Sequence, residues 1–253
     1  MNKWQRLFSR WGLIFFILIL WEITPRLIAP ELGYIMPPPS EIFLLSISVL
    51  SGAAIYSDIA ISLYRIFLGF GLAAIVGISF GLLMGKYFLI QNMFDPLIEI
   101  VRPLSPIALF PLFILFFGIG LTSKVAIIFW ICLFPIILNT VKGVKSVDPI
   151  LLDAAKSMNA SESKIFLSVI FPNSLFWITT GLRISFSSAF VALIAAEMIG
   201  SSSGIGFYVL YSARTFKITE MYLGIIIIGI LGFLFNYLFI KVEERFSHWR
   251  SID

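Results

Sequence analysis

The sequence predicts an all-α polytopic membrane protein with about six transmembrane helices. Apolar residues make up 59% of the 253 residues and charged residues only 13%, whereas soluble domains carry roughly 25% charged residues. The mean hydropathy is +1.01. Residues 66–85 form a run of twenty without a charge, which is long enough to cross about 30 Å of hydrocarbon. These observations exclude an ordinary soluble fold.

Composition also argues against several functions. The net charge is +4, but the basic residues stand singly between apolar runs instead of forming a patch that follows nucleic-acid phosphates. The single cysteine, Cys132, excludes an internal disulfide and a cysteine-based zinc site. The single histidine, His248, is predicted to be solvated in a cytoplasmic tail, residues 246–253. We therefore predict no nucleic-acid partner, no metal site and no catalytic residue.

One glycine-rich segment has a superficial likeness to a phosphate-binding loop. Residues 81–86 read GLLMGK, but position 80 is Phe where the first glycine is needed, and Tyr87 replaces the Ser or Thr. The segment also ends a lipid-facing helix, which is the wrong structural context. The chain is thus expected to bind no nucleotide or other cofactor and not to be an enzyme.

The first region, residues 1–57, is predicted to hold one span and an external loop. The span covers about residues 11–28 and is retained, because no small-residue cleavage site follows it. Residues 29–57 are rich in proline and polar enough to be external. Ser40 is expected to cap a short amphipathic helix, which lies on the membrane surface or packs on neighbouring spans.

The second region, residues 58–245, is predicted to be the transmembrane core. In its first span, residues 66–85, Gly77 and Gly81 are four residues apart, a spacing that lets helices approach closely. A cytoplasmic connection over residues 86–102 then leads to a span over residues 103–120. That span contains Pro103, Pro106 and Pro111, which indicates either a kinked gating helix or static packing.

Three further spans complete the core, at about residues 125–141, 175–199 and 219–240. Glu197 lies within the second of these, where an ionisable group faces a partner or an aqueous cavity. It is a candidate translocation-pathway residue or the partner of a basic group such as Arg183, which is itself a tentative pathway residue. Ser185, Ser187 and Ser188 line the same cavity or bond their own helix backbone.

The distribution of Lys and Arg predicts the orientation. Thirteen of the 18 fall on the inner side and five outside if both termini are cytoplasmic. The excess agrees with the positive-inside rule and places residues 142–173 in the cytoplasm.

Within that interval, residues 153–172 form the longest polar stretch between apolar segments. Asp148 and Pro149 are a good helix start, and Asn159 tolerates the left-handed conformation that ends a helix. Ser161 is expected to cap a second helix that continues to Pro172. The stretch is therefore predicted to be a helix–turn–helix outside the bilayer, a shape suited to docking another protein.

This stretch resembles the cytoplasmic docking loop of permease subunits of bacterial binding-protein-dependent ABC importers. The family signature is matched by an acidic residue, two alanines, a turn residue and an apolar residue before proline: Asp153, Ala154, Ala155, Asn159, Phe171 and Pro172. Asp replaces the commoner Glu, and Asn replaces Gly at the turn. Blocks at residues 62–85, 95–120, 134–160 and 181–206 are also similar to family segments, in the nitrate, taurine and alkanesulfonate branch.

The resemblance implies a type I importer permease fold with a cytoplasmic coupling helix, in a bacterial inner membrane. It implies a complex of two permease copies, two cytoplasmic ATPase subunits that hold ATP and magnesium, and an external solute-binding protein. The docking residues carried over are Asp153, Ala154, Ala155, Asn159, Ala160, Ser161, Glu162, Lys164 and Pro172.

The solute implied by the branch is a small oxyanion such as a sulfonate, taurine or nitrate. A vitamin or pyrimidine precursor in the same class of importer stays open. A self-contained secondary carrier is the rival from another class, although the six spans show no obvious inverted repeat and such a carrier needs no docking loop. A neighbouring gene encoding an ATPase would distinguish the two.

Overall fold

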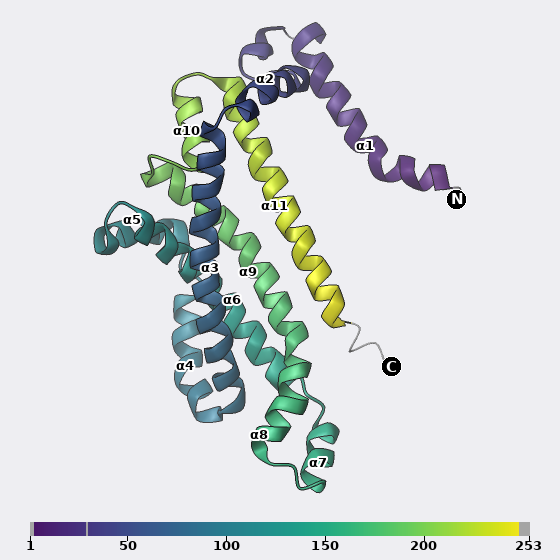
Figure 1. Cartoon of the computed structure of the whole chain (residues 1–253), viewed down its shortest axis with the longest axis vertical. Helices are drawn as coiled ribbons and strands as arrows, with labels where there is room; N and C mark the ends of the chain where they lie inside the picture. Colours follow the sequence, from purple (N-terminus) through teal and green to yellow (C-terminus); the bar gives the residue numbers. More distant parts are fainter. Residues whose placement is uncertain (1–2, 29, 248–253) are drawn as a thin grey trace. The chain divides into compact units, whose positions relative to one another are not determined.

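The computed structural model describes residues 3–28 and 30–247, so His248 and most of the predicted tail lie outside the described residues. The described residues form helices joined by short turns (Figure 1). The α-helices are α1 (Lys3–Ile23), α2 (Pro39–Ser51), α3 (Ala54–Lys86), α4 (Phe88–Val101), α5 (Pro106–Phe117), α6 (Leu121–Lys145), α7 (Pro149–Ser157), α8 (Glu162–Ile165), α9 (Phe171–Gly200), α10 (Ile205–Arg214) and α11 (Ile218–Ser247).

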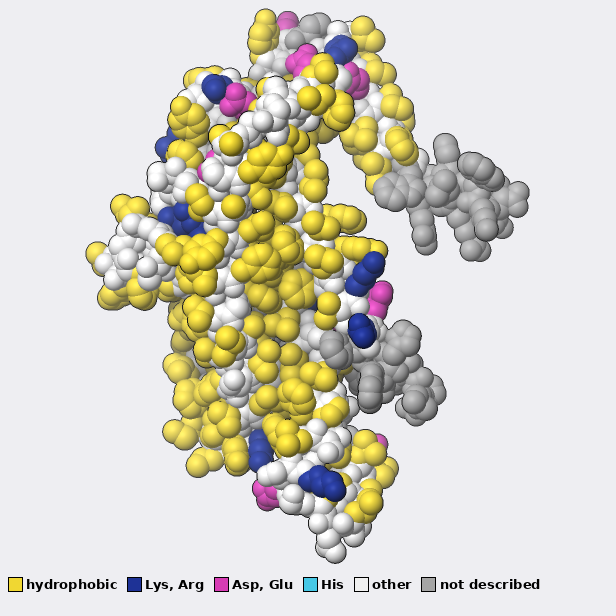
Figure 2. Space-filling view, viewed as in Figure 1, with side chains coloured by type: hydrophobic (Ala, Val, Ile, Leu, Met, Phe, Trp, Pro, Cys, Tyr) yellow, Lys and Arg dark blue, Asp and Glu magenta, His cyan; other side chains and the backbone are white. Residues whose placement is uncertain are grey.

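Four of these helices are each long and apolar enough to cross a membrane: α3, α6, the continuous α8–α9 and α11. Two bent helix pairs also pass this test when each pair is taken together, which brings the total to as many as six. The prediction of an all-α chain with about six spans is confirmed. Hydrophobic side chains cover much of the visible surface of the helices (Figure 2).

The chain divides into two compact units, one formed by residues up to Ala60 with Ser203–Gly229, the other by Ile61–Ser202 with the residues from Ile230 onward. In the first unit, a polar network joins α1 to the start of α2. Glu22 accepts hydrogen bonds from the Ser40 N–H at 3.0 Å and the Ser40 hydroxyl at 2.8 Å, and Arg26 pairs with the same carboxylate at 3.1 Å.

Ser40 therefore does not cap α2, contrary to the prediction. Pro38 occupies the position before the helix, Pro39 is its first residue, and Ser40 uses its hydroxyl on Glu22 instead. A proline in the first turn costs nothing because its missing N–H would be unpaired there. The segment between the predicted spans 175–199 and 219–240 contains α10, and the Asp58 carboxylate holds the turn before it by accepting the Gly204 N–H at 2.7 Å.

The second unit is organised by the close contact of α3 with α6. A Cβ atom built on Gly69, Gly77 or Gly81 would lie only 2.6–2.8 Å from a side-chain carbon of a residue on α6. The partners are Ile128, Ile136 and Thr140, and Gly85 meets Val144 in the same way. Each pair differs by the same number of residues, so the two helices run parallel. The predicted close approach at Gly77 and Gly81 is confirmed.

Helix α9 packs antiparallel against the other side of α6. The Ser185 hydroxyl donates to the Cys132 carbonyl at 3.0 Å, and the Cys132 thiol donates to the Ser185 carbonyl at 3.4 Å. Gly181 approaches Asn139, and Gly143 approaches Ser174. The buried thiol and the small residues thus join α6 to α9 along their length.

The parallel arrangement decides the path between α3 and α6. The chain leaves α3 at Lys86 and enters α6 at Leu121, so it has to return from one end of the bundle to the other. It does so in two pieces, α4 and α5, bent by 100°. The single predicted span over residues 103–120 is therefore wrong: Pro103 lies in the turn, Pro106 starts α5, and α5 has only 12 residues.

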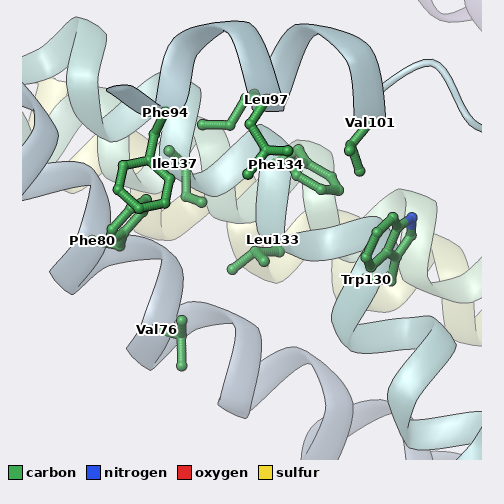
Figure 3. Close-up of a pocket in the computed structure, with 10 residues that line it drawn as sticks. Val76, Phe80, Phe94, Leu97, Val101, Trp130, Leu133, Phe134 and Ile137 are labelled. Carbon is green, nitrogen blue, oxygen red and sulfur yellow. The ribbon is translucent and has the colours of Figure 1, made fainter. Parts of the chain in front are cut away.

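Most of the predicted cytoplasmic connection over residues 86–102 forms α4, which packs against α3 and α6. The Phe94 ring meets Phe80 of α3 edge to face, with ring centroids 4.8 Å apart. Ile98 belongs to a buried cluster with Met84 of α3 and Ile137 of α6. Apolar side chains from all three helices line a pocket of about 490 Å³ beneath α4 (Figure 3).

A glycine-to-alanine pair tests the α3–α6 contact. In Gly81→Ala, the new methyl group meets Thr140 and the Ile137 carbonyl at 3.0 Å or less, so overpacking is expected to cost about 1–3 kcal/mol. Gly71→Ala, on the same helix, meets nothing within 4 Å and is expected to be neutral or stabilising by up to about 1 kcal/mol. Thermal unfolding of the purified permease in detergent measures both. Equal midpoints for the two variants would refute the tight contact.

Candidate functional site

The polar loop between α6 and α9 folds as a helix–turn–helix. The Asp148 carboxylate accepts the Ile150 N–H at 2.8 Å, which caps α7. The Ser161 hydroxyl accepts the Lys164 N–H at 3.4 Å at the start of α8. The predicted start of α7 and the predicted Ser161 cap are both confirmed.

The turn between the two helices explains the residues of the loop signature. The Ala160 N–H donates to the Ala155 carbonyl at 3.1 Å, and the Asn159 N–H donates to the Lys156 carbonyl at 2.9 Å. These two bonds are the Schellman pattern, which needs a left-handed residue just after the helix. Asn159 supplies it with φ of 52°. Asn accepts this conformation more readily than other side-chain-bearing residues, because its short amide bonds locally.

The second helix does not stop at Pro172, contrary to the prediction. Residues from Glu162 to Gly200 form one continuous helix of 39 residues, with a π-helical turn at Phe166–Ile170. In a regular α-helix the Pro172 ring would clash with the carbonyl four residues earlier. The wider turn directly before it, closed by the Phe171 N–H on the Phe166 carbonyl, accommodates the ring.

The loop is exposed, whereas its two stems are held together. Charged side chains lie on the surface of α7 and α8 beside hydrophobic ones (Figure 2). Asp153 forms a weak ion pair with Lys156 at 3.8 Å, with both side chains largely exposed. At the stems, the Asn173 amide donates to the Ser146 hydroxyl at 3.2 Å, and the Lys142 ammonium lies 3.9 Å from the centroid of the Trp177 ring.

The remaining predicted docking residues also lie at the loop. Ala154, Ser161, Glu162, Lys164 and Pro172 are exposed, and Ala155 and Ala160 are half-buried. The structure thus brings all the predicted docking residues except Pro172 to one helix–turn–helix. Pro172 lies one turn further, where α9 begins.

Glu197 lies near the other end of the same continuous helix, in a fully buried polar cluster. Its carboxylate pairs with the Arg65 guanidinium of α3 at 2.6 Å and accepts the Ser62 hydroxyl at 2.8 Å. The exposed fraction is 0% for Glu197 and 7% for Arg65. A buried ion pair with an added hydrogen bond is a structural contact between α3 and α9.

Glu197 does not pair with Arg183, which was the basic residue suggested as its structural partner. Arg183 instead pairs with Glu243 of α11 at 2.8 Å, and Thr180 donates to the same carboxylate at 2.6 Å. The predicted span begins at residue 66, so Arg65 was placed just outside it and was not considered as the partner of Glu197. One feature of the sequence could have indicated this pairing: Arg65 is a lone basic residue directly before the charge-free run 66–85.

The three serines of α9 each donate their hydroxyl to a backbone carbonyl. Ser185 is buried against α6. Ser187 and Ser188 donate to the Arg183 and Ile184 carbonyls of their own helix, which is the alternative of backbone bonding. Lys124, which directly precedes the predicted span over residues 125–141, is buried at the start of α6 and donates to the Gly120 and Gly200 carbonyls at 3.0 and 2.7 Å.

Apolar crossing helices, a broken crossing and an exposed capped loop on a continuous helix together define a membrane-embedded transport subunit. The chain belongs to the family of binding-protein-dependent transport system inner membrane components, whose model matches residues 73–248.

Curated relatives agree with this membership. The chain is 35% identical to the taurine transport system permease protein TauC of Escherichia coli, over 98% of this chain and 94% of that protein. It is 32% identical to the putative aliphatic sulfonates transport permease protein SsuC of Bacillus subtilis, over 93% and 85%. It is 33% identical to the nitrate import permease protein NrtB of Leptolyngbya laminosa, over 76% and 68%.

A solved structure supports the fold. A chain of the MetNI methionine ABC transporter in an inward-facing conformation matches with a TM-score of 0.66 and 16% identity. The match covers 76% of this chain and 95% of that one. The predicted ABC importer permease fold is confirmed.

The Glu197 cluster makes a stability prediction. Glu197→Ala leaves the Arg65 guanidinium buried without its carboxylate, and we expect a loss of about 3–5 kcal/mol. A double variant, Arg65→Met with Glu197→Leu, removes both charges and is expected to recover much of that loss. Thermal unfolding and expression level measure both. A single variant as stable as the wild type would show that the pair is not structural.

Proposed function

We propose that this chain is the permease subunit of an ATP-driven importer that carries a small oxyanion across a bacterial inner membrane. The ATPase and the external binding protein are separate subunits in this proposal, and a second copy of the chain completes the pathway. Hydrolysis of ATP, with its magnesium, belongs to the ATPase subunits. The observation that carries the proposal is the exposed helix–turn–helix joined without a break to α9, in a chain of this family.

The surface of the loop supports a protein partner. Apolar side chains on it are exposed although the loop lies beyond the spans: Ile150 at 73%, Met158 at 83% and Leu167 at 65%. Exposed apolar side chains next to charged ones suit a protein interface. The proposed ATPase contact uses the loop residues from Asp153 to Lys164.

The continuous helix supports a mechanical route from ATPase to pathway. Glu162 and Glu197 are about 50 Å apart along one helix at 1.5 Å per residue. Since the stems are tied by Asn173 and Lys142, displacement of the loop moves α9 with it. In the proposed cycle, closure of the ATPase pair tilts α9, and the pathway then alternates between its two openings.

The solute class rests on the relatives. Their names specify taurine, aliphatic sulfonates and nitrate, which share a compact anionic group with several oxygen atoms. We extend this class to the present chain. The predicted domain limits, residues 1–57, 58–245 and 246–253, and the cytoplasmic location of both termini belong to the same proposal.

The loop turn offers a matched test of coupling. Asn159→Val places a β-branched residue at φ of 52°, which is strongly disfavoured, and is expected to abolish uptake while the permease stays in the membrane. Asn159→Gly suits the same conformation and is expected to keep uptake near the wild-type level. Uptake of labelled taurine, sulfonate or nitrate by cells that express the whole complex measures both. Full uptake in Asn159→Val would contradict the proposed coupling role.

Co-purification tests the assembly itself. Tagged permease extracted from native membranes in mild detergent is expected to recover an ATPase and a solute-binding protein, identified by mass spectrometry. Ala155→Glu adds bulk and charge at the turn and is expected to lose the ATPase. Recovery of the permease alone, with its own solute flux in liposomes, would favour a secondary carrier.

A further inference from the structure

Helix α4 exposes two faces of opposite chemistry. One face carries polar and charged side chains spaced four, four and three residues apart: Gln91, Asp95, Glu99 and Arg102. This spacing places them in one stripe on an α-helix. Another face carries exposed apolar side chains: Leu89, Met93 and Ile100. We call the first set the polar stripe of α4.

The Arg102 end of the polar stripe lies at membrane depth. The buried face of α4 packs on α3 and α6 through Phe94 and Ile98. At one end of the shared pocket, Val101 of α4 lies near Trp130 of α6 (Figure 3). Trp130 is about 14 Å from the first residue of α6 and about 22 Å from the last, at 1.5 Å per residue. Arg102, which follows Val101, is therefore well inside the length of a membrane-crossing helix.

A charge at this depth needs water or a partner. Insertion scales assign roughly 2.5–3.5 kcal/mol to an Arg or Asp at the centre of a bilayer. Within the part of the chain that the structure describes, the Glu99 and Arg102 side chains form no ion pair or hydrogen bond. Gln91 and Asp95 bond each other along the stripe at 2.8 Å. The apolar face of the same helix suits lipid, so the polar stripe faces something else.

The pocket beneath α4 is not the place for an anion. Its ten lining residues are all apolar or aromatic, from Val76 and Phe80 of α3 to Trp130 and Phe134 of α6. An anion buried there would have no partner to offset its lost hydration. The only charges that α4 offers are those of its polar stripe, and among them Arg102 alone attracts an anion.

We infer that the polar stripe of α4 lines the water-filled solute pathway, and that Arg102 contacts the solute anion midway across the membrane. The inference rests on the proposed function for the identity of the solute. Arg102 directly follows the last residue of α4, and α5 begins four residues later, so Arg102 lies at the bend between the two helices. A guanidinium binds the oxygen atoms of a sulfonate or nitrate through two parallel N–H donors.

Cysteine accessibility tests the stripe without reference to the solute. In a Cys132→Ala background, Glu99→Cys and Arg102→Cys are compared with Met93→Cys and Ile100→Cys, which lie on the apolar face. The complex with its ATPase and binding protein is placed in lipid nanodiscs and treated with a small, hydrophilic, membrane-impermeant thiol reagent. We expect stripe positions to react at least ten times faster than apolar positions. Equal rates would overturn the inference, because both faces would then meet the same environment or be equally covered by a second copy.

Transport stoichiometry tests the anion contact. Arg102→Gln removes the charge and is expected to lower the taurine imported per ATP hydrolysed at least fivefold at saturating binding protein, while ATP hydrolysis continues. Arg102→Lys keeps the charge and is expected to retain most of that ratio. A residue with a merely structural role would reduce uptake and hydrolysis together. If Arg102→Gln leaves this ratio unchanged, whether or not uptake and hydrolysis fall together, the proposed contact is overturned.

The two proposals fail in distinguishable ways. If the wild-type complex imports none of taurine, alkanesulfonate and nitrate, the proposed solute class is wrong. The labelling result still decides whether the polar stripe is accessible to water. If the wild type imports taurine and the stripe cysteines react no faster than Met93→Cys and Ile100→Cys, the proposed function stands and the inference on α4 falls.

Discussion

The second unit of the protein depends on the contact between α3 and α6. Glycines at Gly69, Gly77 and Gly81 remove the side chains that would otherwise separate the helices, and α6 fills the space with Ile128, Ile136 and Thr140. Lipid supplies no hydrophobic drive for helices to associate, so such close backbone approach is the main source of affinity within a membrane. The contact also holds the two helices in one parallel register.

The broken crossing follows from that register. Two parallel neighbours require the chain to cross back between them, and α4 with α5 performs this return in two pieces. The break leaves α4 against the inner parts of α3 and α6, with its polar stripe exposed. A straight apolar helix in the same place would satisfy the bilayer equally well, but it would not offer the charged group that we infer to contact the solute. The break and the polar stripe thus belong to one arrangement.

The continuous helix from Glu162 to Gly200 links the loop to the buried ion pair of Glu197 with Arg65. At its loop end the helix is tied to α6 by Asn173 and Lys142. At its other end it is tied to α3 by a carboxylate that is costly to separate from its partner. The π-helical turn before Pro172 is the one irregular segment along the way. A helix held at both ends transmits displacement better than a loop does.

Local chemistry explains which features the sequence predicted well. The start of α7 at Asp148, the turn at Asn159 and the approach at Gly77 and Gly81 each depend on a few neighbouring residues with strong conformational preferences. The continuation of the helix through Pro172 was missed because it depends on the π-helical turn at Phe166–Ile170, which leaves room for the proline ring. Ser40 was mispredicted as a cap because the helix already begins at Pro39, so that Ser40 lies in its first turn and donates its N–H and hydroxyl to Glu22.

By itself, the amino-acid sequence determined that the chain is an all-α membrane protein with a capped polar loop, because hydropathy and capping are read over short windows. Only the tertiary structure decided that Glu197 pairs with Arg65, that Arg183 pairs with Glu243, and that α4 packs beside α3 and α6. These pairings join residues far apart in the chain. The sequence shows that a charge within an apolar span requires a partner, but the identity of that partner depends on how the helices pack.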